Sequence, residues 1–130
     1  MMKATFREVL PLIPLCALIL ALLIYAAMAK KNQTFDGLFV QDLQHSEFYP
    51  RFQGCTPQGT GYWLVPNHDF DKVVPYRLDM NHLDRPNIWR VNLRGDLSRI
   101  GHLGFHGGYW RELSVSYVID ATPLNCEVAK

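Results

Sequence analysis

The sequence has almost no net charge and is poor in charged residues. It carries 13 Lys and Arg against 12 Asp and Glu, and 19% of its 130 residues are charged. Without residues 1–29, which include Lys3, Arg7 and Glu8, the rest of the chain has 11 basic and 11 acidic residues. A neutral domain attracts phosphates weakly, so we expect no nucleic-acid partner. Aromatic residues make up 12% of the chain, which argues against intrinsic disorder.

The local motifs of common catalytic and metal sites are also missing. There is no Cys-x-x-Cys pattern and no His-Glu-x-x-His pattern. No serine stands in a nucleophile elbow, and neither Cys55 nor Cys126 has a neighbouring signature of an activated thiolate. We therefore expect a protein that is not an enzyme and that carries no cofactor.

Histidines supply the alternative, a metal-binding or haem-binding protein. His102 and His106 are four residues apart, but the glycines around them preclude a helix that would place both on one face. A loop could still bring the two imidazoles together, with Cys55 as a further ligand. We expect surface and loop histidines instead, and keep His102 and His106 as the metal ligands of the alternative.

One long apolar run lies near the N-terminus. The 21 residues from Val9 to Ala29 contain no charged side chain, and Lys30 and Lys31 follow them. At about 1.5 Å per helical residue the run reaches roughly 31 Å, about the thickness of the hydrocarbon core of a bilayer. We therefore predict that residues 1–31 are a membrane anchor with a single transmembrane helix, so that the lipid bilayer is one partner.

A cleaved signal peptide is the alternative for this segment. Lys3 and Arg7 give it a basic start, and residues 27–29 read Ala-Met-Ala, like a cleavage site. The length of the run favours the retained anchor, because the apolar part of a signal peptide usually has about 7–15 residues. Two basic residues precede the run and two follow it, so charge does not set the orientation.

Cysteine is scarce, with three residues in the chain. Two of them, Cys55 and Cys126, lie in the predicted domain 32–130. An even pair in a small exported domain predicts a disulfide, and two free thiols in a cytosolic domain are the alternative. With the signal-like N-terminus, the pair predicts a protein of the cytoplasmic (inner) membrane whose C-terminal domain lies in the periplasm or outside.

The domain 32–130 shows short strands and turns. Residues 88–95 alternate strictly, which places Trp89, Val91 and Leu93 on a buried face. The same alternation in residues 109–120 predicts a second buried row, made of Leu113, Val115, Tyr117 and Ile119. A further short strand is predicted near residues 72–76, and the four glycines in residues 101–108 predict a loop.

These elements predict the fold class. About five short strands, long irregular connections and no convincing amphipathic helix indicate a mainly β domain, either a small closed barrel or a compact sandwich. We expect a small antiparallel OB-like β-barrel after the transmembrane helix.

Two groups of residues resemble patterns in known proteins. The first is Phe35-Asp36-Gly37-Leu38-Phe39 with Ser46, Phe48 and Pro50, and the second is Gly95-Asp96-Leu97-Ser98 with Gly101, Gly104, Gly107 and residues 109–113. Both resemble patterns in small uncharacterised bacterial exported lipoproteins and membrane-anchored proteins with an OB-like barrel. The resemblance covers about half of the domain and implies a location and a fold rather than an activity. The chain departs from it by lacking a lipobox and by having Arg51 where a cysteine commonly follows the proline, with Cys55 four residues on.

Arg111 and Glu112 are adjacent at the start of the last predicted strand, so they point to opposite faces. We expect one of them to brace the glycine loop or the barrel mouth. The candidate structural or interaction residues are Trp89, Tyr109, Trp110, Arg111 and Glu112. The sequence as a whole predicts a non-enzymatic, membrane-tethered extracytoplasmic module, an accessory or interaction subunit of an integral membrane protein complex.

Overall fold

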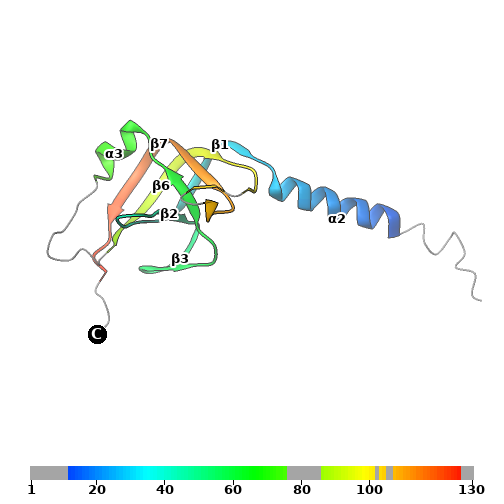
Figure 1. The fold of residues 1–130 in the computed structure, drawn as a ribbon, viewed down its shortest axis with the longest axis horizontal. Helices are drawn as coiled ribbons and strands as arrows, with labels where there is room; N and C mark the ends of the chain where they lie inside the picture. Colours follow the sequence, from blue (N-terminus) through cyan, green and yellow to red (C-terminus); the bar gives the residue numbers. More distant parts are fainter. Residues whose placement is uncertain (1–11, 76–85, 102, 105–106, 127–130) are drawn as a thin grey trace, which may run out of the picture.

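The computed structural model describes residues 12–75, 86–101, 103–104 and 107–126 (Figure 1). This part of the chain is mainly β, as predicted, with a closed barrel, a two-stranded hairpin and two helices. The barrel strands are β1 (Lys30–Gln41), β2 (Ser46–Tyr49), β5 (Tyr62–Val65), β6 (Asn87–Leu97) and β7 (Glu112–Pro123). The hairpin is β3 (Arg51–Gln53) and β4 (Thr56–Gln58), and the helices are α2 (Leu12–Ala27) and α3 (His68–Val73).

The barrel strands follow the order β1-β2-β5-β7-β6, and β6 pairs with β1 to close the sheet. Neighbours are antiparallel except for β5 and β7, which are parallel. In the chain, α3 lies between the third and fourth barrel strands. The structure thus confirms a mainly β fold, and the parallel pair β5–β7 departs from the antiparallel barrel that the sequence predicts.

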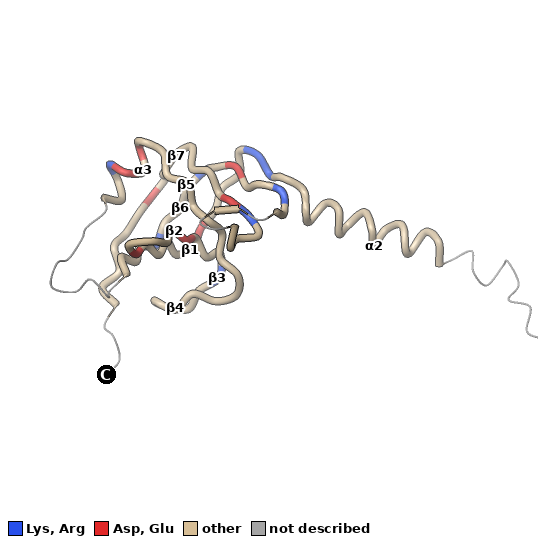
Figure 2. The backbone as a smooth tube through the Cα atoms, viewed as in Figure 1, with Lys and Arg blue, Asp and Glu red and all other residues tan. Residues whose placement is uncertain are grey.

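The predicted single transmembrane helix is wrong. The helix α2 has 16 residues, and at about 1.5 Å per residue it is roughly 24 Å long, short of a hydrocarbon core of about 30 Å. No helix in the described residues is long and apolar enough to cross a membrane. At its C-terminal end the apolar run extends past the helix, because Met28 and Ala29 form the connection between α2 and β1; residues 9–11 of the run lie outside the described residues. Figure 2 shows that α2 carries no charged residue and that charges of both signs lie over the barrel.

The core fills the barrel with side chains from every barrel strand and from α3. As predicted, Trp89, Val91 and Leu93 of β6 are buried. The full cluster comprises Phe39, Phe48, Leu64, Phe70, Val74, Trp89, Val91, Leu93, Leu97, Leu113, Val115 and Val118.

The short helix α3 brings Phe70 into this core. Its ring packs edge-to-face against the ring of Phe39, with the two ring centroids 5.0 Å apart. Asn67 caps the helix, because its side-chain oxygen accepts a hydrogen bond of 2.9 Å from the Phe70 amide. The strand predicted near residues 72–76 is therefore wrong at Lys72 and Val73, which belong to α3.

Two of the predicted core residues, Tyr117 and Ile119, are on the outside of the barrel. They are 59% and 48% exposed, whereas Val118 between them is buried. The pairing of β6 with β7 skips one residue of β7 at two places, so Ser116 and Ile119 are each an extra residue in a β-bulge. Each bulge shifts the alternation by one residue, which the sequence pattern did not reveal.

The predicted disulfide between Cys55 and Cys126 is confirmed, with Cα atoms 5.9 Å apart. It joins the β3–β4 hairpin to the segment after β7. The hairpin packs against β1 on the outside of the barrel. Leu38 of β1 is fully buried, and it is paired with Tyr49 of β2 and with Arg90 of β6 in the sheet. The disulfide thus holds the β3–β4 hairpin to the segment after β7.

Candidate functional site

The outer wall of the barrel at β2 and β5 carries a cluster of aromatic residues around one carboxylate. Phe48 and Leu64 point into the core, so their neighbours Glu47 and Trp63 point outward. These two residues are opposite one another in the sheet. Together with Tyr49 and Tyr109 they form what we call the aromatic face: Glu47, Tyr49, Trp63 and Tyr109.

The Glu47 carboxylate accepts hydrogen bonds from two phenols. The Tyr109 hydroxyl donates to Glu47 Oε1 at 2.7 Å, and the Tyr49 hydroxyl donates to Glu47 Oε2. Burial, with the hydrogen bond to Glu47 and its charge, raises the pKa of Tyr49 to about 12. The same causes raise the pKa of Tyr109 above its ordinary value. Both phenols therefore keep their protons and remain donors at neutral pH.

The loop between β6 and β7 lies against this face. Leu103 and Tyr109 form a backbone bridge, and the Tyr109 ring lies 5.2 Å from the Trp63 ring, tilted by 50°. Gly104 has φ +75°, and a Cβ atom there would collide with the Trp63 ring. Glycine is required because only a residue without a side chain allows both the positive φ and the close contact. The loop is thus held on the face by Glu47 and Trp63.

Loops of the barrel border this face on two sides. Trp110 follows Tyr109 and is 60% exposed. At the β1–β2 turn, the Asp42 carboxylate accepts hydrogen bonds from the backbone of Gln44 and His45 and lies 3.0 Å from the His45 Nδ1. Partial burial by itself raises the pKa of Asp42, but these interactions outweigh it and lower the pKa. The turn is therefore an ordered border of the aromatic face.

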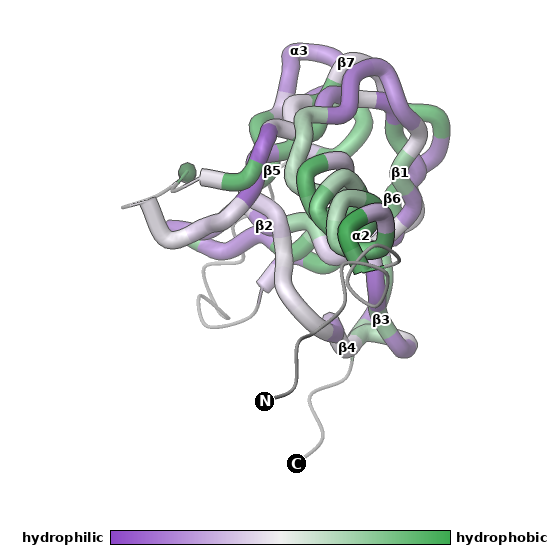
Figure 3. Tube along the Cα trace, turned by 90° about the vertical axis from the view of Figure 1, so that its right-hand side faces the viewer, coloured by the Kyte–Doolittle hydropathy of each residue, from purple (hydrophilic) through white to green (hydrophobic). Residues whose placement is uncertain are grey.

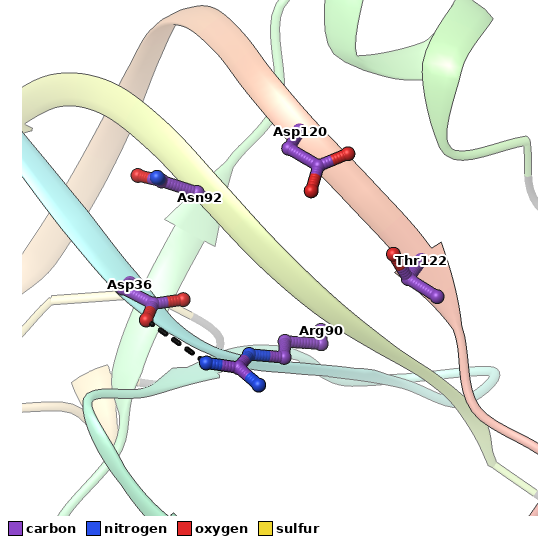
Figure 4. Close-up of a pocket in the computed structure, with 5 residues that line it drawn as sticks. All are labelled: Asp36, Arg90, Asn92, Asp120 and Thr122. Atoms are coloured by element: carbon purple, nitrogen blue, oxygen red, sulfur yellow. Dashed lines mark hydrogen bonds and ion pairs between the residues drawn. The ribbon is translucent and has the colours of Figure 1, made fainter.

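A second feature is a polar hollow on the outside of β1, β6 and β7, shown in Figure 4. This hollow, which we call the polar hollow, has a volume of ≈ 240 Å³. It is lined by Asp36, Arg90, Asn92, Asp120 and Thr122. One oxygen of Asp36 lies 3.4 Å from an Arg90 nitrogen, and the guanidinium stands 5.6 Å over the Phe52 ring. The Asn92 Oδ1 is buried and accepts no hydrogen bond.

Arg111 connects α2 to the barrel. Its guanidinium donates to the carbonyls of Ala26 at 3.2 Å and Met28 at 2.6 Å, and its Nε donates to the carbonyl of Ser98 at 3.0 Å. These bonds satisfy carbonyls at the C-terminal end of α2, where a cation is favourable. Arg111 therefore braces the start of the glycine-rich loop and the end of the helix.

The other residues singled out from the sequence have different roles. Trp89 is in the core, and its Nε1 donates to the Asn87 side chain at 3.0 Å. The Glu112 amide donates to Ser98 Oγ at 2.8 Å, so this residue also anchors the loop. Of the predicted set, Tyr109 alone belongs to the aromatic face.

The histidines of the metal alternative, His102 and His106, lie outside the described residues. Within the described ranges, no three or more His, Cys, Asp or Glu residues are grouped as metal ligands. The Cys55 sulfur is bonded to Cys126 and so is not a free thiolate ligand.

Sequence reasoning missed the residues at the centre of both features. Glu47 carried a usable signal, because a charged residue next to the apolar Phe48 in a short strand must point outward. Asp36, Asn92 and Asp120 carried none, because their proximity depends on the pairing of three strands that are far apart in the chain.

Comparisons of the chain with protein-family models, with curated proteins and with solved structures gave no match.

Proposed function

We propose that this protein is a non-enzymatic interaction module that acts outside the cytoplasm and binds a partner protein through the aromatic face. The observation that carries this proposal is the Glu47 cluster. It orders tyrosine and tryptophan side chains from two strands and a loop on one outer wall of the barrel, and the exposed Trp110 follows Tyr109 in the chain.

The chemistry of the face favours a protein over other partners. The Tyr49 and Tyr109 hydroxyls are already bonded to Glu47, so the two tyrosines offer a partner mainly aromatic area. Tyrosine and tryptophan are enriched at the centres of protein interfaces. A carboxylate at the middle of the face also opposes the phosphates of nucleic acids.

Two observations support the location and the role in an assembly. The Cys55–Cys126 disulfide is typical of an oxidising compartment outside the cytoplasm. In α2, large apolar side chains are exposed, and Figure 3, which looks along the helix, shows mainly hydrophobic colouring around it. Exposed apolar surface of this extent marks an interaction site. A role as accessory subunit of an integral membrane protein complex stays a prediction.

Quantitative affinity purification of the full chain in mild detergent tests the proposal. Trp110→Ala should reduce the yield of the co-purifying partner about tenfold or more, because exposed tryptophans often dominate an interface. Tyr117→Ala is the matched control, since Tyr117 is 59% exposed but lies on β7 away from the face. A partner recovered equally well with both variants would refute the role of the aromatic face.

A further inference from the structure

We propose that the polar hollow is a second binding site, for a neutral, hydroxyl-rich ligand of the size of one sugar ring. The site is independent of the aromatic face, because it lies on β1, β6 and β7 rather than on β2 and β5. Four observations carry the proposal: the size of the hollow, the bulge beside it, its unpartnered acceptors and the mixture of its charges.

The strand register builds the hollow from two rows of side chains. Asp36, Asn92 and Asp120 are directly opposite one another on three adjacent strands, and Arg90 is opposite Thr122 in the next row. Strands lie about 4.8 Å apart and rise about 3.4 Å per residue, so the two rows cover roughly 10 Å by 7 Å. This area and the volume of ≈ 240 Å³ match a single pyranose ring with its hydroxyl groups.

A bulge in β7 aims one of these side chains into the hollow. Ile119 is the extra residue between the Asn92–Asp120 and Leu93–Val118 pairs, so Ile119 and Asp120 both lie on the outside. In a regular strand starting from the buried Val118, Asp120 would point into the core. Bulges often re-aim a side chain beside a functional site, and here the bulge puts a carboxylate opposite Asn92.

The hollow contains acceptors without donors. The Asn92 Oδ1 is buried and accepts no hydrogen bond. Within the described residues, the Asp120 carboxylate has neither an ion pair nor a hydrogen bond, and the contact of Asp36 with Arg90 is long at 3.4 Å. The exposed carboxylate of Asp120 is therefore the acceptor open to a ligand that donates hydrogen bonds.

The charges select the class of ligand. Two carboxylates oppose an anion, while the Arg90 guanidinium opposes a cation and offers donors that an ammonium group or a metal ion cannot accept. The predominantly polar lining offers little surface to an apolar ligand. Hydroxyl groups both donate and accept, so neighbouring hydroxyls can bond the exposed carboxylates of Asp120 and Asp36 while accepting from Arg90 or Thr122.

Arg90 is held in place for this task. Its guanidinium stands over the Phe52 ring of β3, and Cys55 of the same hairpin is bonded to Cys126. The disulfide thereby fixes the ring that supports the main donor of the hollow.

Backbone amide NMR of the full chain, in a detergent without a sugar headgroup, tests the proposal. The probes are D-glucose, D-galactose and N-acetyl-D-glucosamine, with methylamine as a cation probe. At least one sugar should shift the amides of residues 90–92 and 120–122 in a saturable way. Asp120→Ala should weaken this binding by about tenfold, and Thr122→Val, which removes one hydroxyl at constant shape and charge, by about threefold.

Asp71→Ala is the matched control, because it removes a carboxylate from α3 outside the hollow and should leave the affinity for the sugar unchanged. The spectrum of each variant without ligand shows whether its fold is retained. Three results would overturn the proposal: no saturable shift with any of the three sugars, binding that neither hollow variant weakens, or saturable binding of methylamine that depends on Asp120.

Discussion

Glu47 joins three parts of the chain that are distant in sequence. Its carboxylate accepts from Tyr49 on its own strand and from Tyr109 in the β6–β7 loop, and its strand neighbour across the sheet is Trp63. Hydrogen bonds to an ionised acceptor are stronger than those between neutral groups. One carboxylate therefore sets both the order of the aromatic face and the position of the loop.

The charge of Glu47 can be tested through the tyrosines. Glu47→Gln should lower the pKa of Tyr49 from about 12 toward 10 and lower that of Tyr109 as well, because a neutral amide does not oppose the phenolate charge. NMR titration of the tyrosine ring carbons bonded to oxygen measures both values, with Asp71→Asn as the control for loss of a distant charge. Unchanged tyrosine titration in Glu47→Gln would show that the carboxylate does not govern the face.

The same pKa shifts fix the pH dependence of this part of the fold. Each phenol has a higher pKa in the folded chain than its ordinary value of 10.0, so the folded state holds the proton more tightly than the unfolded state. The stabilisation is therefore complete below about pH 10 and is lost as the pH rises through the folded-state pKa.

At the scale of elements, β7 is the strand whose shape decides where the side chains lie. Its two bulges leave Val115, Val118 and Ala121 facing the core at three-residue intervals, in place of the two-residue interval of a regular strand. Extra residues increase the local bend, which a small barrel needs in order to close.

The bulges can be tested by two adjacent substitutions. Val118→Asp should destabilise the fold by several kcal/mol, because it buries a carboxylate without a partner in the core. Tyr117→Asp should change the stability by about 0.5 kcal/mol or less, because this side chain is on the surface. Chemical denaturation measures both. The reverse order would mean that β7 is regular and that Tyr117 is a core residue.

What the sequence predicts depends on whether the signal is local. The alternation in residues 88–95 and the cysteine pair are local or compositional signals, and the structure confirms the strand core at Trp89, Val91 and Leu93 and the disulfide. The bulges of β7 and the helix α3 were missed, because a one-residue insertion and a six-residue helix leave no periodicity to detect. The rows of the polar hollow depend on long-range pairing, which no local pattern encodes.

At the scale of the whole molecule, the disulfide closes a loop over most of the barrel. Cys55 and Cys126 are 71 residues apart in the chain. In the chain-entropy model, closing a loop of this length stabilises the folded state by about 4 kcal/mol. This is a large share of the stability of a small domain, which buries a modest fraction of its surface.

The molecule presents three separate surfaces on this barrel. The aromatic face is on β2 and β5, the polar hollow is on β1, β6 and β7, and α2 projects from the barrel at the Arg111 junction (Figure 1). The tyrosine hydroxyls of the aromatic face are bonded to Glu47 within the chain, whereas the hollow leaves the Asp120 carboxylate open. This difference is why we assign a protein partner to the first and a hydroxyl-rich ligand to the second.

Photo-crosslinking in the native cell tests most directly whether the aromatic face binds a partner protein. A photoreactive phenylalanine replaces Trp110, the neighbour in sequence of Tyr109 of the aromatic face, in one full-length variant. In the other it replaces Tyr117, which is paired with Arg94 of β6; the two positions are 60% and 59% exposed. We predict a crosslink from position 110 to one defined protein, and none to that protein from position 117. The same crosslinks from both positions, a crosslink from position 117 alone, or none from either would contradict the account.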